Sequence, residues 1–146
     1  MTSLKKFLKS KSYTKIPLVL TETNHFEIVA KINGVSGRFI LDTGASNTCI
    51  GMDKIDVFKM LSETSDIKAA GAGATEMETL VSTKNKVQIG DWKKGRQKIV
   101  LFDLSHVNTA LTSHNALPVD GIIGADILKK GKAVIDYNKK SLYLKK

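Results

Sequence analysis

The sequence predicts a small all-β domain, closed or sandwiched, with one or two short helices. Apolar and polar residues alternate over residues 26–32, which is the period of a half-buried strand. Turn signals such as Asn33-Gly34 recur between short apolar runs. The 146 residues, 42% of them hydrophobic, suffice for one domain with a real core but not for two full lobes.

The other elements follow in chain order. Leu4, Phe7 and Leu8 have the spacing of a short amphipathic helix, and Ile55, Phe58 and Leu61 show helical spacing within residues 53–63. Further strands are expected at residues 38–41, 48–52, 96–104, 132–137 and 141–144, and at both ends of residues 66–90. Turns are expected at residues 91–95 and 138–140, and a short helix at Ala125 to Lys130.

Charge and cysteine content narrow the function classes. The formal net charge is +9, with lysines gathered near both termini. No aromatic residues alternate with these lysines and no zinc-ligand spacing exists, so a solvated surface is favoured over specific nucleic-acid binding. The single cysteine, Cys49, excludes an intrachain disulfide, suits a reducing compartment, and is interpreted as a buried packing residue. No apolar run approaches the length of a membrane span.

The N-terminal segment is basic and contains no acid before Glu22. Its apolar run, residues 16–20, is short, contains Pro17 and lacks a small-residue cleavage site, although a targeting segment remains the alternative. We therefore expect a basic N-terminal arm over residues 1–15, a domain over residues 16–146, and a cytoplasmic protein.

One carboxylate occupies an unusual position. Asp42 follows three apolar residues and directly precedes Thr43, Gly44 and Ala45. A strand would hold the carboxylate rigidly, while the glycine permits a tight turn and the threonine hydroxyl can lock that turn by hydrogen bonding. The alternative is a turn aspartate that accepts backbone hydrogen bonds. A second apolar element, Ile122-Ile123-Gly124, lies near the C-terminus.

The segments FILDTGASNTCI and GIIGADIL together resemble the active-site loop and the downstream hydrophobic-hydrophobic-glycine element of the retropepsin-like aspartic proteases. The resemblance covers nearly the whole chain, from about residue 16 to residue 144. The long N-terminal extension is more similar to cellular or bacterial members than to a minimal retroviral form. The fold implied is a small closed β-barrel that is active as a two-fold dimer.

The resemblance implies an aspartic endopeptidase without metal or other cofactor, in which Asp42 is catalytic and Thr43, Gly44 and Ala45 support the loop. Because the chain holds one Asp-Thr-Gly, two Asp42 carboxylates can meet only in a homodimer. The substrate would be a protein or peptide in extended conformation. The flap of this family would correspond to the small residues Gly71, Ala72, Gly73 and Ala74.

Several residues depart from the retroviral pattern. Ser46 and Asn47 stand where retroviral members usually carry acids, and Ala125 and Asp126 stand where they carry arginine, so subsite preference and dimer bracing are expected to differ. Asp120 is interpreted as a turn residue and Asp126 as a helix N-terminal acid. The three histidines are expected at the surface. A protease-like dimerisation or peptide-binding module without turnover is the alternative function, and a basic nucleic-acid-associated factor is a third.

Overall fold

The computed structural model describes residues 3–69 and 77–146, so the flap expected at Gly71, Ala72, Gly73 and Ala74 lies outside the described residues. The helices are α1 (Leu4–Ser10), the 3₁₀ helix η1 (Met52–Lys54), α2 (Ser105–Ser113) and α3 (Ala125–Lys130). The first strands are β1 (Tyr13–Pro17), β2 (Val19–Leu20), β3 (Phe26–Ile32), β4 (Val35–Leu41), β5 (Cys49–Gly51) and β6 (Glu63–Ala69). The others are β7 (Met77–Ile89), β8 (Trp92–Phe102), β9 (Gly121–Ile123), β10 (Val134–Asp136) and β11 (Ser141–Lys145).

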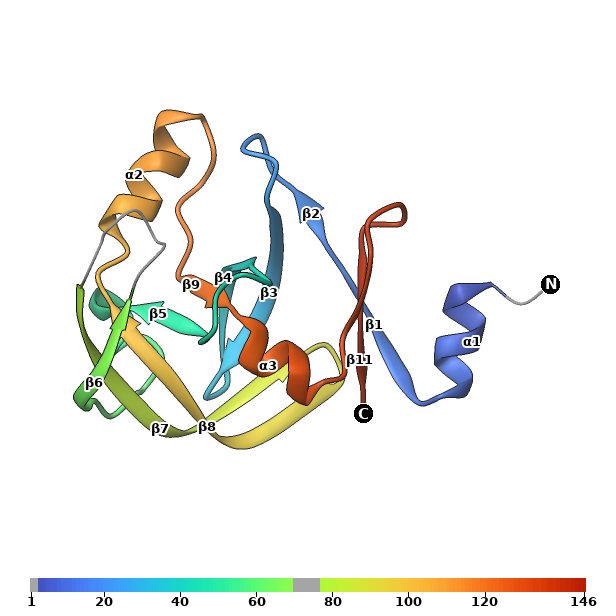
Figure 1. Cartoon of the computed structure of the whole chain (residues 1–146), viewed down its shortest axis with the longest axis horizontal. Coiled ribbons are helices and arrows are strands. Elements are labelled where there is room, and N and C mark those ends of the chain that lie inside the picture. Colours follow the sequence, from blue (N-terminus) through green and yellow to red (C-terminus); the bar gives the residue numbers. More distant parts are fainter. Residues whose placement is uncertain (1–2, 70–76) are drawn as a thin grey trace.

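A closed six-stranded barrel forms the body of the protein (Figure 1). Its strands follow the order β3-β4-β9-β5-β8-β7, and pairing of β3 with β7 at Lys31↔Gln88 and Ile32↔Val87 closes the ring. The short β9 lies between β4, to which it is parallel, and β5, to which it is antiparallel. Closure leaves β2 and β6 as the edges of this sheet, next to β3 and β7 respectively.

The hairpin of β3 and β4 confirms the turn expected at Asn33-Gly34. Both turn residues have positive φ, 52° and 85°, the backbone that a two-residue type I′ turn requires. The register then places Phe26 opposite Leu41, so the chain before β3 and the chain after β4 lie at the same end of the barrel. Asp42 follows Leu41 and therefore lies at that end.

Two clusters of apolar side chains make up the core. The larger fills the barrel interior and includes the fully buried residues Ile32, Phe39, Ile50, Ile99, Leu101, Ile123 and Leu142. The smaller lies between the other faces of the same strands and α2, and contains Ile40, Cys49, Val100, Phe102, Leu104, Leu111, Val119 and Ile122. Strands β4, β5, β8 and β9 are therefore covered by apolar side chains on both faces.

Helix α2 was not predicted from the sequence. Its nine residues include threonine, serine and asparagine, which have low helix propensity, and it buries only Leu111. Asp103 stabilises its start, because the backbone N–H of Ser105 donates to Asp103 Oδ1 at 2.8 Å. Hydrogen bonds from the backbone and hydroxyl of Ser105 lower the pKa of Asp103 below its usual value.

The helical spacing at Ile55, Phe58 and Leu61 was misleading. Residues 52–59 form η1 followed by turns, and Leu61 is 83% exposed. Phe58 is buried against Phe39, and its carbonyl accepts a 2.8 Å hydrogen bond from Asn33 Nδ2. This contact from the β3–β4 turn gives the Phe58 carbonyl a partner outside any helix.

The chain ends form a separate small sheet. Its order is β1-β11-β10, so β11 is paired on both sides within one chain, and α1 contacts β1 (Figure 1). The sheet confirms the hairpin expected near the C-terminus, and β1 adds residues 13–17 to it. The turn expected over residues 91–95 is shorter, since β8 already starts at Trp92. Within the described residues, no helix has the length and apolarity needed to cross a membrane.

The packing of α2 can be tested through Leu111, which is 3% exposed. Leu111→Ala removes the only buried residue of α2, and we expect it to lower the free energy of unfolding by about 2–4 kcal/mol in urea denaturation. The control is Leu117→Ala, because Leu117 is 62% exposed and its truncation should cost less than about 0.5 kcal/mol. Equal losses in the two variants would contradict the packing described for α2.

Candidate active site

Asp42 is held at the end of β4 by the backbone of β9. Its N–H donates to the Ile123 carbonyl at 3.0 Å, which extends the β4–β9 pairing by one step beyond Leu41↔Ile123. The strand before Asp42 is packed on both faces, with Phe39 in one cluster and Ile40 in the other. The position of the Asp42 backbone is therefore fixed by the barrel itself.

A tight turn then orients the Asp42 side chain. The N–H of Gly44 donates to Asp42 Oδ1 at 2.8 Å, and the N–H of Ala45 donates to the Asp42 carbonyl at 3.2 Å. A Cβ at position 44 would approach Asp42 Oδ1 to 3.3 Å, so glycine favours this close contact. Asp42 is half-buried, while Thr43 and Gly44 are exposed. The carboxylate thus sits at the base of an exposed loop tip.

The element Ile122-Ile123-Gly124 lies directly against this loop. Ala125 N–H donates to the Ala45 carbonyl at 2.7 Å. A Cβ on Gly124 would lie 2.7 Å from that carbonyl oxygen and 2.9 Å from the Asn47 backbone. Only glycine therefore allows this approach. The segment that follows Asp42 and the segment around Gly124, which are far apart in the sequence, thus lie against each other in the fold.

The loop has a second anchor that the sequence reading did not identify. Asp126 Oδ1 accepts hydrogen bonds from the Thr48 hydroxyl at 2.7 Å, the Thr48 N–H at 2.9 Å and the Ile127 N–H at 2.8 Å. The Thr48 hydroxyl in turn accepts from the Gly124 N–H at 3.0 Å. The position of Asp126 in the first turn of α3 was expected, but its contact with fully buried Thr48 was not.

Cys49 is unsuited to act as a nucleophile. It is buried between the strands, and burial, together with the negative charge of Asp126, raises the pKa of its thiol to about 12. A protonated, buried thiol is not a nucleophile, which confirms its interpretation as a packing residue. The three histidines are exposed, as expected.

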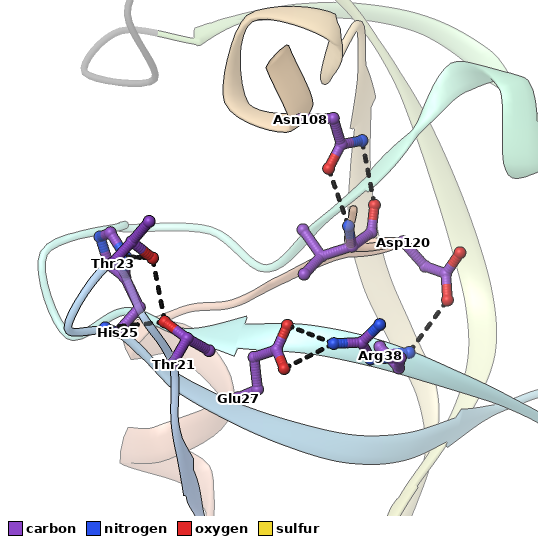
Figure 2. Close-up of polar contacts among 8 residues, drawn as sticks. Thr21, Thr23, His25, Glu27, Arg38, Asn108 and Asp120 are labelled. Carbon is purple, nitrogen blue, oxygen red and sulfur yellow. Dashed lines mark hydrogen bonds and ion pairs between the residues drawn. The ribbon is translucent and has the colours of Figure 1, made fainter. Parts of the chain in front are cut away.

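Asp120 and its neighbours form a separate polar group (Figure 2). Arg38 N–H donates to Asp120 Oδ2 at 2.9 Å, and the Arg38 guanidinium contacts both Glu27 oxygens at 2.7 and 2.6 Å. Lys54 Nζ lies 3.8 Å from Asp120 Oδ1. The Asp120 side chain therefore accepts one hydrogen bond that holds β4 in place. No hydrogen bond joins Asp42 to a second acidic side chain among the described residues.

The strands that flank the expected flap pair antiparallel, with Ala69 opposite Met77. Residues 71–74 themselves lie outside the described part of the chain. No group of three side chains suited to hold a metal ion occurs within residues 3–69 and 77–146.

The family model for aspartyl proteases matches residues 28–127, which include Asp42, the loop after it and Gly124. The chain belongs to the aspartyl protease family. The match spans more than half of the chain and confirms the family inferred from the sequence. No curated protein matches the chain.

Solved structures with the same fold come from a virus, a bacterium and a protozoan. EIAV protease in complex with the inhibitor HBY-793 is 19% identical, covers 75% of this chain and 90% of its own, and gives a TM-score of 0.57. A retropepsin-like aspartic protease from Rickettsia conorii is 20% identical over 90% of both chains, with a TM-score of 0.58. The retroviral protease-like domain of Ddi1 from Leishmania major is 18% identical over 81% of this chain and 86% of its own, with a TM-score of 0.58. The barrel of this family member is therefore retropepsin-like, as predicted.

The Thr48 anchor can be tested by Thr48→Val, which keeps the shape of the side chain and removes its hydroxyl. Because Asp126 and the Gly124 N–H each lose a partner in a buried place, we expect the free energy of unfolding to fall by about 1–3 kcal/mol. Ser46→Ala is the control, since Ser46 is exposed in the same loop and should be nearly neutral. A neutral Thr48→Val would show that the anchor does not stabilise the loop.

Proposed function

We propose that the protein is an aspartic endopeptidase in which Asp42 carries the catalytic carboxylate. The strongest support is the way in which the Asp42 carboxylate is held, in a chain that belongs to the aspartyl protease family. Asp42 Oδ1 is oriented by the Gly44 N–H, on a turn fixed by β9 and α3, at the base of an exposed loop tip. A positioned carboxylate that reaches solvent is the arrangement general acid–base catalysis requires.

The second carboxylate must come from a second copy of the chain. The sequence contains one Asp-Thr-Gly. Asp126 is engaged with Thr48 and Asp120 with Arg38, so neither is placed to pair with Asp42. A two-fold axis beside the loop brings Asp42 of each protomer together, and the active enzyme is then a homodimer.

Two features of the described surface support this dimer. Thr43 is exposed, and its hydroxyl makes no hydrogen bond within the described residues, so it is available to brace the same loop of a partner. At the same end of the barrel, β2 is a sheet edge that carries exposed Val19 and Leu20. An apolar edge beside the loop is a surface that a second copy would cover.

The chemistry follows from placing two carboxylates close together. Both cannot ionise cheaply, so the pair shares one proton, and that protonation state belongs to the dyad rather than to either residue. The ionised Asp42 takes a proton from a water molecule while the oxygen of that water attacks the peptide carbonyl carbon. The protonated Asp42 of the other protomer donates to the carbonyl oxygen. No metal or other cofactor enters this reaction.

The substrate is a peptide in extended conformation, held through its main chain between the loop and the flap. Gly71, Ala72, Gly73 and Ala74 are proposed as the flap, at the end of the β6–β7 pair. Ser46 and Asn47 carry no charge, so acidic recognition of the substrate backbone from these positions is not expected.

The test is cleavage of a diverse peptide library from about pH 4 to pH 7, over a range of protein concentrations. Asp42→Asn removes the ionisable group with little change in shape, and we expect cleavage to fall by at least about a thousandfold. Asp56→Asn is the matched control, because Asp56 is exposed and lies outside the loop, in the turns that follow η1, and cleavage by this variant should be unchanged.

Cleavage that survives in Asp42→Asn would remove Asp42 from the catalytic role. Peptide binding without turnover by the wild type would support the non-catalytic binding module instead. Below the dimer dissociation constant, the cleavage rate per protomer should rise with protein concentration. A rate per protomer that stays constant would contradict a site shared by two protomers.

A further inference from the structure

A lysine-lined pocket lies at the far end of the barrel from Asp42. The pocket has a volume of about 400 Å³ and its lining comes from three places: the start of β8, the end of α3 and the end of β11. The lining residues are Asp91, Trp92, Lys93, Lys94, Lys130, Lys132, Lys145 and Lys146. Figure 1 shows the β7–β8 hairpin beside the end of α3 and the last strand.

We infer that this pocket binds a compact polyanion with several closely spaced phosphate groups, such as a linear polyphosphate or a nucleoside triphosphate. The inference is independent of the proteolytic function proposed for Asp42. Its basis is the convergence of six lysines on one recess, since a cleft lined by one sign of charge focuses the electrostatic field and concentrates ions of the opposite sign.

The charge in the pocket is not neutralised within the described chain. Six lysines and one aspartate give the lining side chains a formal charge of +5. The two ion pairs found among the described residues, Arg38–Glu27 and Lys54–Asp120, involve none of the pocket lysines. Lys130 has a neutral partner, because its amine donates to Gln97 Oε1. Six like charges held together with a single counter-charge, Asp91, favour an anionic ligand.

The backbone that carries these lysines is fixed in place. Lys145 N–H donates to the Gly131 carbonyl at 2.7 Å, and Tyr13 Oη donates to the Lys132 carbonyl at 2.9 Å. Lys93 and Lys94 lie in the ladder of β7 and β8, opposite Gln88 and Val87. The lysine side chains are flexible, but the walls from which they extend are preorganised, which lowers the cost of ligand binding.

The shape of the pocket favours a small ligand over a nucleic acid. Its volume falls in the range of small-molecule sites, and its single aromatic residue, Trp92, is 3% exposed and cannot stack on bases. Lysine provides compact point charges with rotatable donors, which suits a chain of phosphates presented in several orientations. Polyphosphate and nucleoside triphosphates share this chemistry.

The pocket and the candidate active site lie at opposite ends of β8. Lys93 is near its start, whereas Val100 N–H donates to the Thr48 carbonyl beside the active-site loop. At about 3.3 Å per residue the two positions are roughly 20 Å apart along the strand. A ligand in the pocket therefore does not occupy the peptide site.

The experiment titrates inorganic tripolyphosphate into the full 146-residue chain by calorimetry, at low and at moderate salt. We expect the wild type to bind, with an affinity that falls as salt rises. The double variant Lys93→Glu, Lys94→Glu should raise the dissociation constant at least about tenfold, because two attractive charges beside the ligand become repulsive.

The matched control is Lys139→Glu, Lys140→Glu. These two lysines are also adjacent and exposed, but they lie in the turn between β10 and β11, at the other end of β11 from Lys145. At moderate salt the same change in net charge should raise the dissociation constant less than about threefold, because the five residues of β11, about 16 Å, exceed the Debye length of about 10 Å. Circular dichroism melting curves of both variants show whether they are folded.

If tripolyphosphate binding weakens equally in the two folded variants, the inference is overturned, because the ligand is then attracted by the net charge of the protein rather than by the pocket. Failure of the wild type to bind tripolyphosphate at millimolar concentration would also overturn it. ATP is expected to displace tripolyphosphate, and ATP that binds without displacing it would contradict a shared site. Single-stranded RNA that binds the wild type and not Lys93→Glu, Lys94→Glu, in the absence of tripolyphosphate binding, would assign the pocket to nucleic acid instead.

Discussion

The close approach of Gly124 to the loop that carries Asp42 is the constraint on which the candidate site depends. A side chain at this position would collide with the Ala45 and Asn47 backbone, so the loop can reach its place only over a glycine. Once there, the loop is held by Ala125 N–H on one side and by Thr48 bonded to Asp126 on the other. The carboxylate of Asp42 is then positioned by parts of the chain about eighty residues away, rather than by the local turn alone.

This constraint explains the arrangement of the strands around it. β9 lies between β4 and β5, which carry the two ends of the loop, and it continues directly into α3. One short segment, Gly121–Lys130, therefore contributes a strand to the barrel, the glycine under the loop and the acid that binds Thr48. The apolar clusters on both faces of these strands keep that segment from shifting.

Features with a local cause were predictable from the sequence. The β3–β4 hairpin follows from Asn33-Gly34 and the period-two pattern, and the short helix expected at Ala125 to Lys130 is α3, with the same bounds. Features set by distant contacts were not. The spacing over residues 53–63 suggested a helix, but Asn33 binds the Phe58 carbonyl across the fold and η1 forms instead. The Thr48–Asp126 bond joins residues 78 positions apart, and the sequence pattern near either residue gives no sign of it.

The most direct test of the account is a mixing experiment with wild type and Asp42→Asn protein, at a total concentration where dimers form and exchange. If each active site needs Asp42 from two protomers, cleavage should fall as the square of the wild-type fraction, because mixed dimers are inactive. If cleavage falls in direct proportion to the wild-type fraction, each chain acts with its own carboxylate, and the shared dyad is wrong.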